Sequence, residues 1–101
     1  CQARSASSAN RALVVNDLNN TAEVSGATTA LTLDATIGVG GDMITIVGLT
    51  TAPFTITCSA TLSWLQGGTV TNGVRTIAPN SVVTLYKSSD TTWRIWGNGI
   101  S

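Results

Sequence analysis

Residues 81–97 of the chain read SVVTLYKSSDTTWRIWG. The first part of this segment alternates apolar and polar side chains, which puts Val83 and Leu85 on one face of a strand. The last part repeats the alternation with Trp93 and Ile95. A short polar run, Lys-Ser-Ser-Asp-Thr, separates the two parts and favours a turn. Alternation on both sides of a short polar turn predicts a β-hairpin.

Shorter alternating segments precede this hairpin at intervals of about ten residues, with turn-forming residues between them. The clearest are residues 29–35, 42–47 and 54–58. They are rich in Val, Ile and Thr, whose branched Cβ atoms favour pleated structure. The sequence therefore predicts an all-β fold, a compact antiparallel β-sandwich or small barrel of about eight short strands.

Several turns are predicted from residues that tolerate positive φ. Residues 17–20 (Asp-Leu-Asn-Asn) form one such turn, and residues 48–53 are expected to form another. The dipeptide Asn72-Gly73 is the strongest two-residue hairpin signal in the chain. We expect it to join a brief strand at residues 69–71 to a strand at residues 74–78.

Residues 1–10 (CQARSASSAN) are small and polar, and we expect them to form a flexible N-terminal arm or linker. Residues 11–101 are expected to form a single β domain, because about 100 residues suit one domain. The chain begins at Cys1 rather than Met. We favour a trimmed or incompletely covered chain over a lipidated mature lipoprotein, because no signal sequence is visible.

The chain carries few charges. Only 10% of its residues are charged and its formal net charge is +0, whereas a typical soluble domain has about 25% charged residues. Low charge weakens repulsion between copies, so assembly is favoured over a monomer covered in Thr and Ser hydroxyls. The five basic residues are scattered among five acidic ones, which argues against a nucleic-acid partner. No apolar run reaches about 18 residues, so no membrane span is expected.

Residues needed for catalysis are scarce. The chain has no His, which removes the usual general base near neutral pH and the commonest metal ligand. Its five carboxylates fall on different predicted strands and turns without the pairing that glycoside hydrolysis requires. Cys1 and Cys58 cannot complete a zinc site alone, and Cys58 is expected to be a buried free thiol. We therefore expect no enzymatic activity, no bound metal and no cofactor.

The aromatic side chains supply the candidate contact residues. Trp93 is in phase with Ile95, so we expect it in the core. Trp96 is on the opposite face of the predicted strand, where it is available to a neighbouring chain, a flanking loop or a sugar ring. We favour packing against a chain or loop over sugar binding. The candidate interface or ligand contacts are Trp96, Arg94, Tyr86 and Trp64.

The segments TTALTLDATIGVGGDMITIVGL and NSVVTLYKSSDTTWRIWGNG, with the Pro-Phe-Thr-Ile-Thr strand between them, resemble modules of tailed-bacteriophage tail fibres and related virion proteins. The resemblance covers residues 11–99. The matching residues are Leu31, Leu33, Gly41, Asp42, Ile44, Ile46, Ile56, Val83, Thr84, Leu85, Trp93, Ile95 and Gly97.

This resemblance implies a non-enzymatic, β-rich component of the virion, usually a homotrimer. A tail-fibre or spike module presents a surface to a host glycan or envelope protein, and a capsid decoration protein clamps other virion proteins. The alternative is a secreted bacterial carbohydrate-binding or adhesion module, in which Trp96, Tyr86 or Trp64 stacks on a sugar. A small glycan-active enzyme is a third possibility, which the absent His and the unpaired carboxylates argue against.

Overall fold

The computed structural model describes residues 4–7, 10–26, 28–65, 70–89 and 91–101. Within these ranges the chain forms eleven strands and one turn of 3-10 helix, η1 (Val15–Asp17). The expected all-β class is confirmed. The strands are β1 (Arg4–Ser7), β2 (Arg11–Leu13), β3 (Thr21–Gly26), β4 (Ala30–Leu33), β5 (Met43–Thr50), β6 (Phe54–Cys58), β7 (Thr61–Leu65), β8 (Val70–Asn72), β9 (Arg75–Ile77), β10 (Ser81–Ser89) and β11 (Thr92–Gly97).

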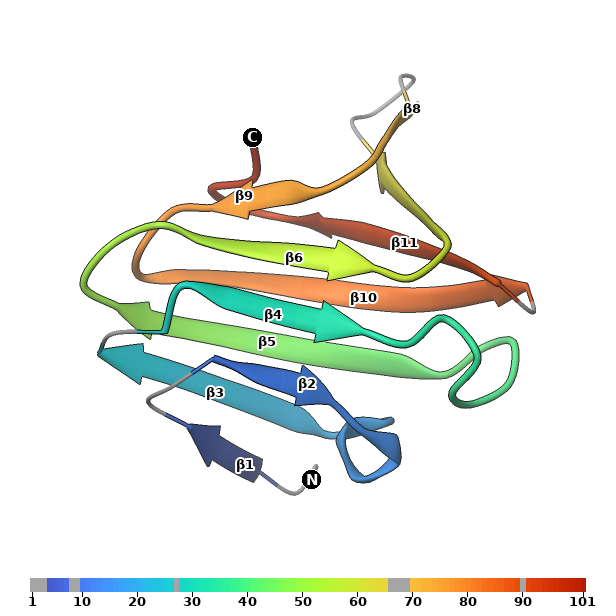
Figure 1. Cartoon of the computed structure of the whole chain (residues 1–101), viewed down its shortest axis with the longest axis horizontal. Coiled ribbons are helices and arrows are strands. Elements are labelled where there is room, and N and C mark those ends of the chain that lie inside the picture. Colours follow the sequence, from blue (N-terminus) through green and yellow to red (C-terminus); the bar gives the residue numbers. More distant parts are fainter. Residues whose placement is uncertain (1–3, 8–9, 27, 66–69, 90) are drawn as a thin grey trace.

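The strands form two mixed sheets. The large sheet has seven strands in the order β1-β3-β5-β10-β11-β7-β8, and the small sheet has four in the order β2-β4-β6-β9. Figure 1 shows two layers, with β2, β4 and β6 lying over β3, β5 and β10. A single cluster of buried side chains lies between the layers. The large sheet contributes Ala22, Val24, Ile44, Ile46, Leu62, Val83, Leu85, Trp93 and Ile95, and the small sheet contributes Leu13, Leu31, Leu33, Phe54, Ile56 and Ile77.

The predicted hairpin is confirmed, and it supplies β10 and β11 at the centre of the large sheet. The two strands pair antiparallel, with Leu85 opposite Ile95. These two side chains and those of Val83 and Trp93 are buried. Each such burial contributes about 1.5–3 kcal/mol. The hairpin turn is shorter than expected, because β10 continues as far as Ser89.

From β1 to β6 the chain alternates between the two sheets. Each strand from β3 to β6 lies parallel to the strand two places earlier. β11 also pairs parallel with β7, so five of the nine pairings in the described ranges are parallel. The expected antiparallel arrangement is therefore wrong for much of the chain, and the sheets do not close into a barrel. Alternation alone cannot separate the two ladder types, because both use a two-residue period.

Part of the expected N-terminal arm is a strand. Residues Arg4–Ser7 form β1, which pairs parallel with β3, from Arg4 opposite Thr21 to Ser7 opposite Val24. The segment has no apolar period that predicts a strand. A sheet edge with unpaired N–H and C=O groups accepts an added strand largely independently of side-chain pattern. The other residues of the expected arm, 1–3 and 8–9, lie outside the described ranges.

Two predicted turns are wrong in place or kind. The Asn72-Gly73 dipeptide crosses between sheets, because β8 pairs with β7 and β9 pairs with β6. Gly73 has a positive φ of 118° and Asn72 does not, whereas a type I′ turn needs it at both positions. The turn expected at residues 48–53 begins only after Thr50. Gly48 lies within β5, where a Cβ would be 2.6 Å from Phe54, so this glycine permits close packing.

The C-terminal segment joins the two sheets. Ile100 forms an antiparallel bridge with Ile77 of β9. The backbones of Ser101 and Thr76 exchange two hydrogen bonds, of 2.9 and 3.2 Å. The chain therefore leaves the large sheet after β11 and covers the β9 edge of the small sheet.

Candidate contact surface

Three of the candidate contact residues gather on the outer face of the large sheet. Because β10 and β11 direct their apolar series into the core, alternation directs Tyr86, Arg94 and Trp96 outward. Tyr86 lies opposite Arg94 in the ladder. The rings of Tyr86 and Trp96 have centroids 6.3 Å apart and are tilted by 48°. We call these three half-buried residues the aromatic surface.

Arg94 differs from the other described cations in its lack of a partner. Arg11 forms an ion pair, Arg75 lies over an indole ring, and Lys87 donates to backbone carbonyls. Within the described ranges, no hydrogen bond, ion pair or ring contact engages the Arg94 side chain. Its guanidinium has five N–H donors and is always charged. It is therefore available to an anionic group outside the chain.

Apolar side chains continue from the aromatic surface along the same sheet face. Met43 lies opposite Tyr86, and Val47 lies opposite Val82. Val82 and Leu49 are 51% and 49% exposed. We call Val47, Leu49 and Val82 the apolar strip. Apolar side chains that gather on one exposed face are typical of a protein contact.

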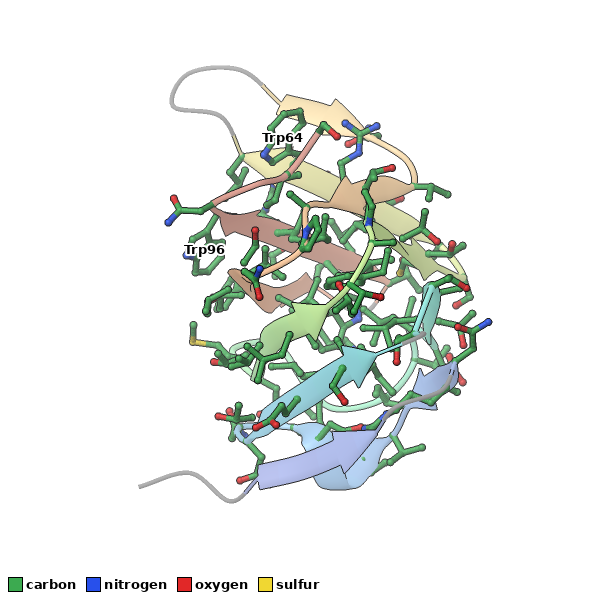
Figure 2. All side chains as sticks on the ribbon, turned by 90° about the vertical axis from the view of Figure 1, so that its left-hand side faces the viewer. Trp64 and Trp96 are labelled. Carbon is green, nitrogen blue, oxygen red and sulfur yellow. The ribbon has the colours of Figure 1, made fainter. Side chains whose placement is uncertain are left out.

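Trp64 does not join the aromatic surface. It lies in β7 opposite Ile95 in parallel register, so it shares the inner face of the sheet with Ile95. It packs against the core, and the guanidinium of Arg75 lies 5.4 Å from its ring centroid. Figure 2 shows Trp96 projecting from the molecular surface and Trp64 apart from it. The candidate set thus separates into an outer group of three and one inner residue.

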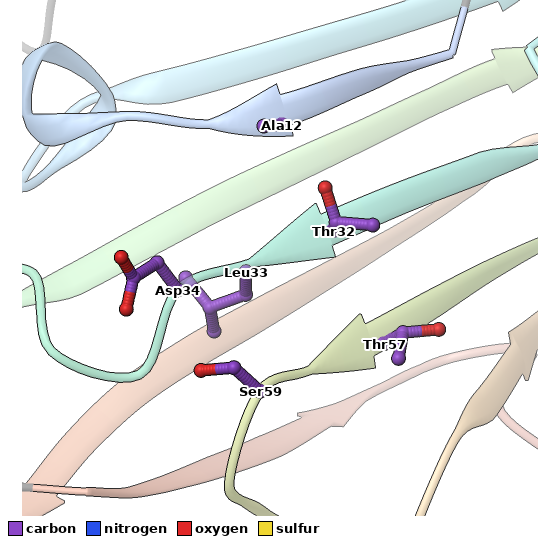
Figure 3. A pocket seen from close by; sticks show the side chains of 6 residues that line it. All are labelled: Ala12, Thr32, Leu33, Asp34, Thr57 and Ser59. Atoms are coloured by element: carbon purple, nitrogen blue, oxygen red, sulfur yellow. The ribbon is translucent and has the colours of Figure 1, made fainter.

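The outer face of the small sheet has a hollow of about 370 Å³. Ala12, Thr32 and Thr57 stand in register along it, and Asp34 lies at one end (Figure 3). The hydroxyl and the backbone N–H of Thr36 donate to Asp34 at 2.7 and 2.9 Å, and these bonds lower the pKa of that carboxyl. The hollow thus offers hydroxyls and one ionised carboxylate, without a paired acid and base.

Sequence reasoning missed Lys87, which was expected in the polar turn and is only 2% exposed. Its Nζ donates to the carbonyls of Ile37 and Gly38 at 2.8 and 3.2 Å. The available signal was its phase, because Lys87 continues the two-residue period of the buried positions in β10. Its contacts give it a structural role in holding a loop.

Other reactive groups are few in the described ranges. They contain no group of three or more His, Cys, Asp or Glu side chains that could hold a metal ion. The Cys58 thiol is free and half-buried, rather than fully buried as expected, and burial raises its pKa. In the same part of the chain, no helix has the length and apolar character needed to cross a membrane.

No family model, no curated protein and no solved structure matches the chain. The likeness to tailed-phage modules therefore depends on the motif residues of the sequence alone.

Proposed function

We propose that the chain is a non-enzymatic structural protein of a bacteriophage virion. It acts as a trimeric tail-fibre or spike module, or as a capsid decoration protein, in particle assembly, stability or host attachment. Its two layers then form a β-sandwich of mixed sheets within the extracellular particle. The resemblance of residues 11–99 to virion modules supports this assignment.

The apolar strip is the observation that carries the proposal. Val82 and Leu49 are each about half exposed to water, on one face of the seven-stranded sheet. Covering such a face with another subunit is favourable by about 25 cal/mol per Å² of apolar area. The low charge of the chain adds little repulsion between copies. An obligate assembly is therefore the state that best suits this face.

The solution mass of the isolated chain tests the proposal. Light scattering from dilute to concentrated solution should give a trimer whose mass does not change with concentration. A monomer over the whole range would overturn the trimeric fibre and spike form. A second measurement, ordering on capsids or co-purification with virion proteins, then decides whether a decoration protein remains. Failure of both would reject the virion assignment.

A secreted carbohydrate-binding or adhesion module is the second candidate. The observation in its favour is the aromatic surface, where Tyr86 and Trp96 offer two neighbouring rings to a ligand. This candidate requires a monomer whose Trp emission changes on addition of sugar. The oligomeric state thus separates the two candidates directly.

A further inference from the structure

We propose that the aromatic surface binds an acidic saccharide, a sugar ring that carries a carboxylate. The inference rests on the host-attachment part of the proposed function and names the ligand class of that surface. It requires Arg94 to hold the carboxylate, and Trp96 and Tyr86 to contact the ring.

Arg94 gives the aromatic surface a positive charge. Its side chain lies on the outer face of the large sheet and has no partner within the described ranges. A planar guanidinium matches a carboxylate with two parallel N–H···O bonds, and such charge-assisted bonds are roughly twice as strong as neutral ones. A neutral sugar would leave this cation uncompensated, so the unpaired charge selects an anionic ligand.

Two aromatic side chains lie beside Arg94 on the same face of the sheet. Tyr86 lies directly opposite it, and Trp96 is two residues further along β11 on the same face. Aromatic rings offer flat apolar surface to the C–H face of a sugar. Among the described residues, no hydrogen bond engages the phenol of Tyr86 or the indole N–H of Trp96, so both can meet sugar hydroxyls. The hydroxyl of Thr84, opposite Trp96, has no hydrogen-bond partner in the described ranges and adds a donor and an acceptor. Together these groups suit a ligand that is both cyclic and hydroxylated.

A second copy of the chain fits this surface less well. A symmetric contact centred on the aromatic surface would bring two Arg94 guanidinium groups together, and like charges across an interface are unfavourable. The three residues of the apolar strip, further along the face, are themselves uncharged. The two surfaces therefore suit different partners, a saccharide and a subunit.

The experiment uses the three indole N–H signals of the full chain in a proton–nitrogen correlation NMR spectrum, assigned by single substitution. The probes are hexagalacturonate, a hyaluronan hexasaccharide and α2,8-linked oligosialic acid, each titrated to millimolar concentration. Fully methyl-esterified hexagalacturonate is the neutral control with the same backbone. The Trp93 signal is an internal control, because its Nε1 donates to the buried carbonyl of Ala35 at 3.3 Å.

At least one acidic probe should shift the Trp96 signal and leave the Trp93 signal in place, and the methyl ester should have no effect. Arg94→Gln should weaken binding by at least about tenfold. Arg75→Gln removes the same charge from the small sheet and should leave binding unchanged. Absence of a Trp96 shift with all three acidic probes would overturn the proposal, and so would equal effects of the two substitutions.

These outcomes are separate from those of the proposed function. A trimer without a Trp96 shift rejects the saccharide site and leaves the virion assignment standing. A monomer with an Arg94-dependent shift keeps the saccharide site and favours a carbohydrate-binding module.

Discussion

Lys87 and Trp93 lie opposite each other in the central hairpin, and their side chains hold the same loop. The Nζ of Lys87 is 6.0 Å from the ring centroid of Trp93. It donates to the carbonyls of Ile37 and Gly38, while the indole N–H of Trp93 donates to that of Ala35. The loop between β4 and β5 is thereby fixed over the end of the core.

Lys87→Met should lower the free energy of unfolding by about 2 kcal/mol, because two sheltered carbonyls lose their donor. Urea unfolding followed by Trp fluorescence measures the change. Arg94→Met, which removes an unpaired cation of the neighbouring strand, is the control and should change stability by less than about 0.5 kcal/mol. Equal effects of the two substitutions would show that the loop contacts of Lys87 add no stability.

Gly97→Ala should destabilise the protein much more than Gly41→Ala. Both glycines have positive φ, of 146° and 99°. A Cβ at Gly97 would also lie 2.5 Å from the carbonyl oxygen of Val82, whereas a Cβ at Gly41 meets no atom within 4 Å. Backbone strain alone costs about 1–2 kcal/mol, and the clash adds to it only at Gly97. Equal shifts in thermal melting temperature would contradict the packing argument.

Val82→Glu should convert the expected trimer to a monomer without unfolding the chain, because it places a charge in the apolar strip. Light scattering gives the mass, and circular dichroism reports on the fold. Val39→Glu is the matched control, since Val39 is 69% exposed in a loop outside the strip. If Val82→Glu remains trimeric, the subunit contact lies elsewhere.

Acid should weaken the loop between β4 and β5 through Asp42. The backbone N–H of Val39 and the amide of Asn19 donate to this carboxylate, and both bonds lower its pKa below the ordinary 3.8. A carboxyl whose pKa is lowered by folding stabilises the folded state at pH values above its ordinary pKa. This stabilisation is lost as the pH falls toward the lowered pKa. Melting temperature measured from about pH 5 to about pH 2 should therefore fall less steeply for Asp42→Asn than for the wild type. Parallel curves would remove Asp42 from the acid response.

The strands were predictable where the pattern is local. Residues 54–58 form the strand that the sequence predicts, and the hairpin at 81–97 follows its alternation. The partners of the strands were not predictable, because a two-residue period does not encode whether the neighbour is parallel. Asn72-Gly73 also shows that local sequence does not determine strand partners. Its preference for a hairpin turn is overridden because β8 pairs within the large sheet and β9 within the small sheet.

The candidate site was predictable only where its residues belong to one local segment. Tyr86, Arg94 and Trp96 meet because they belong to one hairpin, whose register follows from the turn. Trp64 comes from β7, where its two-residue period with Leu62 favours the inner face of the sheet. Its place relative to the hairpin residues depends on the pairing of β7 with β11, which the period does not encode. The apolar strip depends on β5 lying beside β10, which is a pairing between distant segments.

The alternation of strands between the two sheets has a kinetic consequence. In the described ranges, two of the nine pairings join strands that follow each other in sequence, namely β7 with β8 and β10 with β11. The other pairings join strands that are further apart in sequence, such as Thr61 with Thr92. The entropy of closing the intervening loop is lost before the paired strands make stabilising contacts. Chains of such topology fold slowly. During synthesis β5 gains its second neighbour only once β10 has emerged, so we expect the native state to form only after that strand is available.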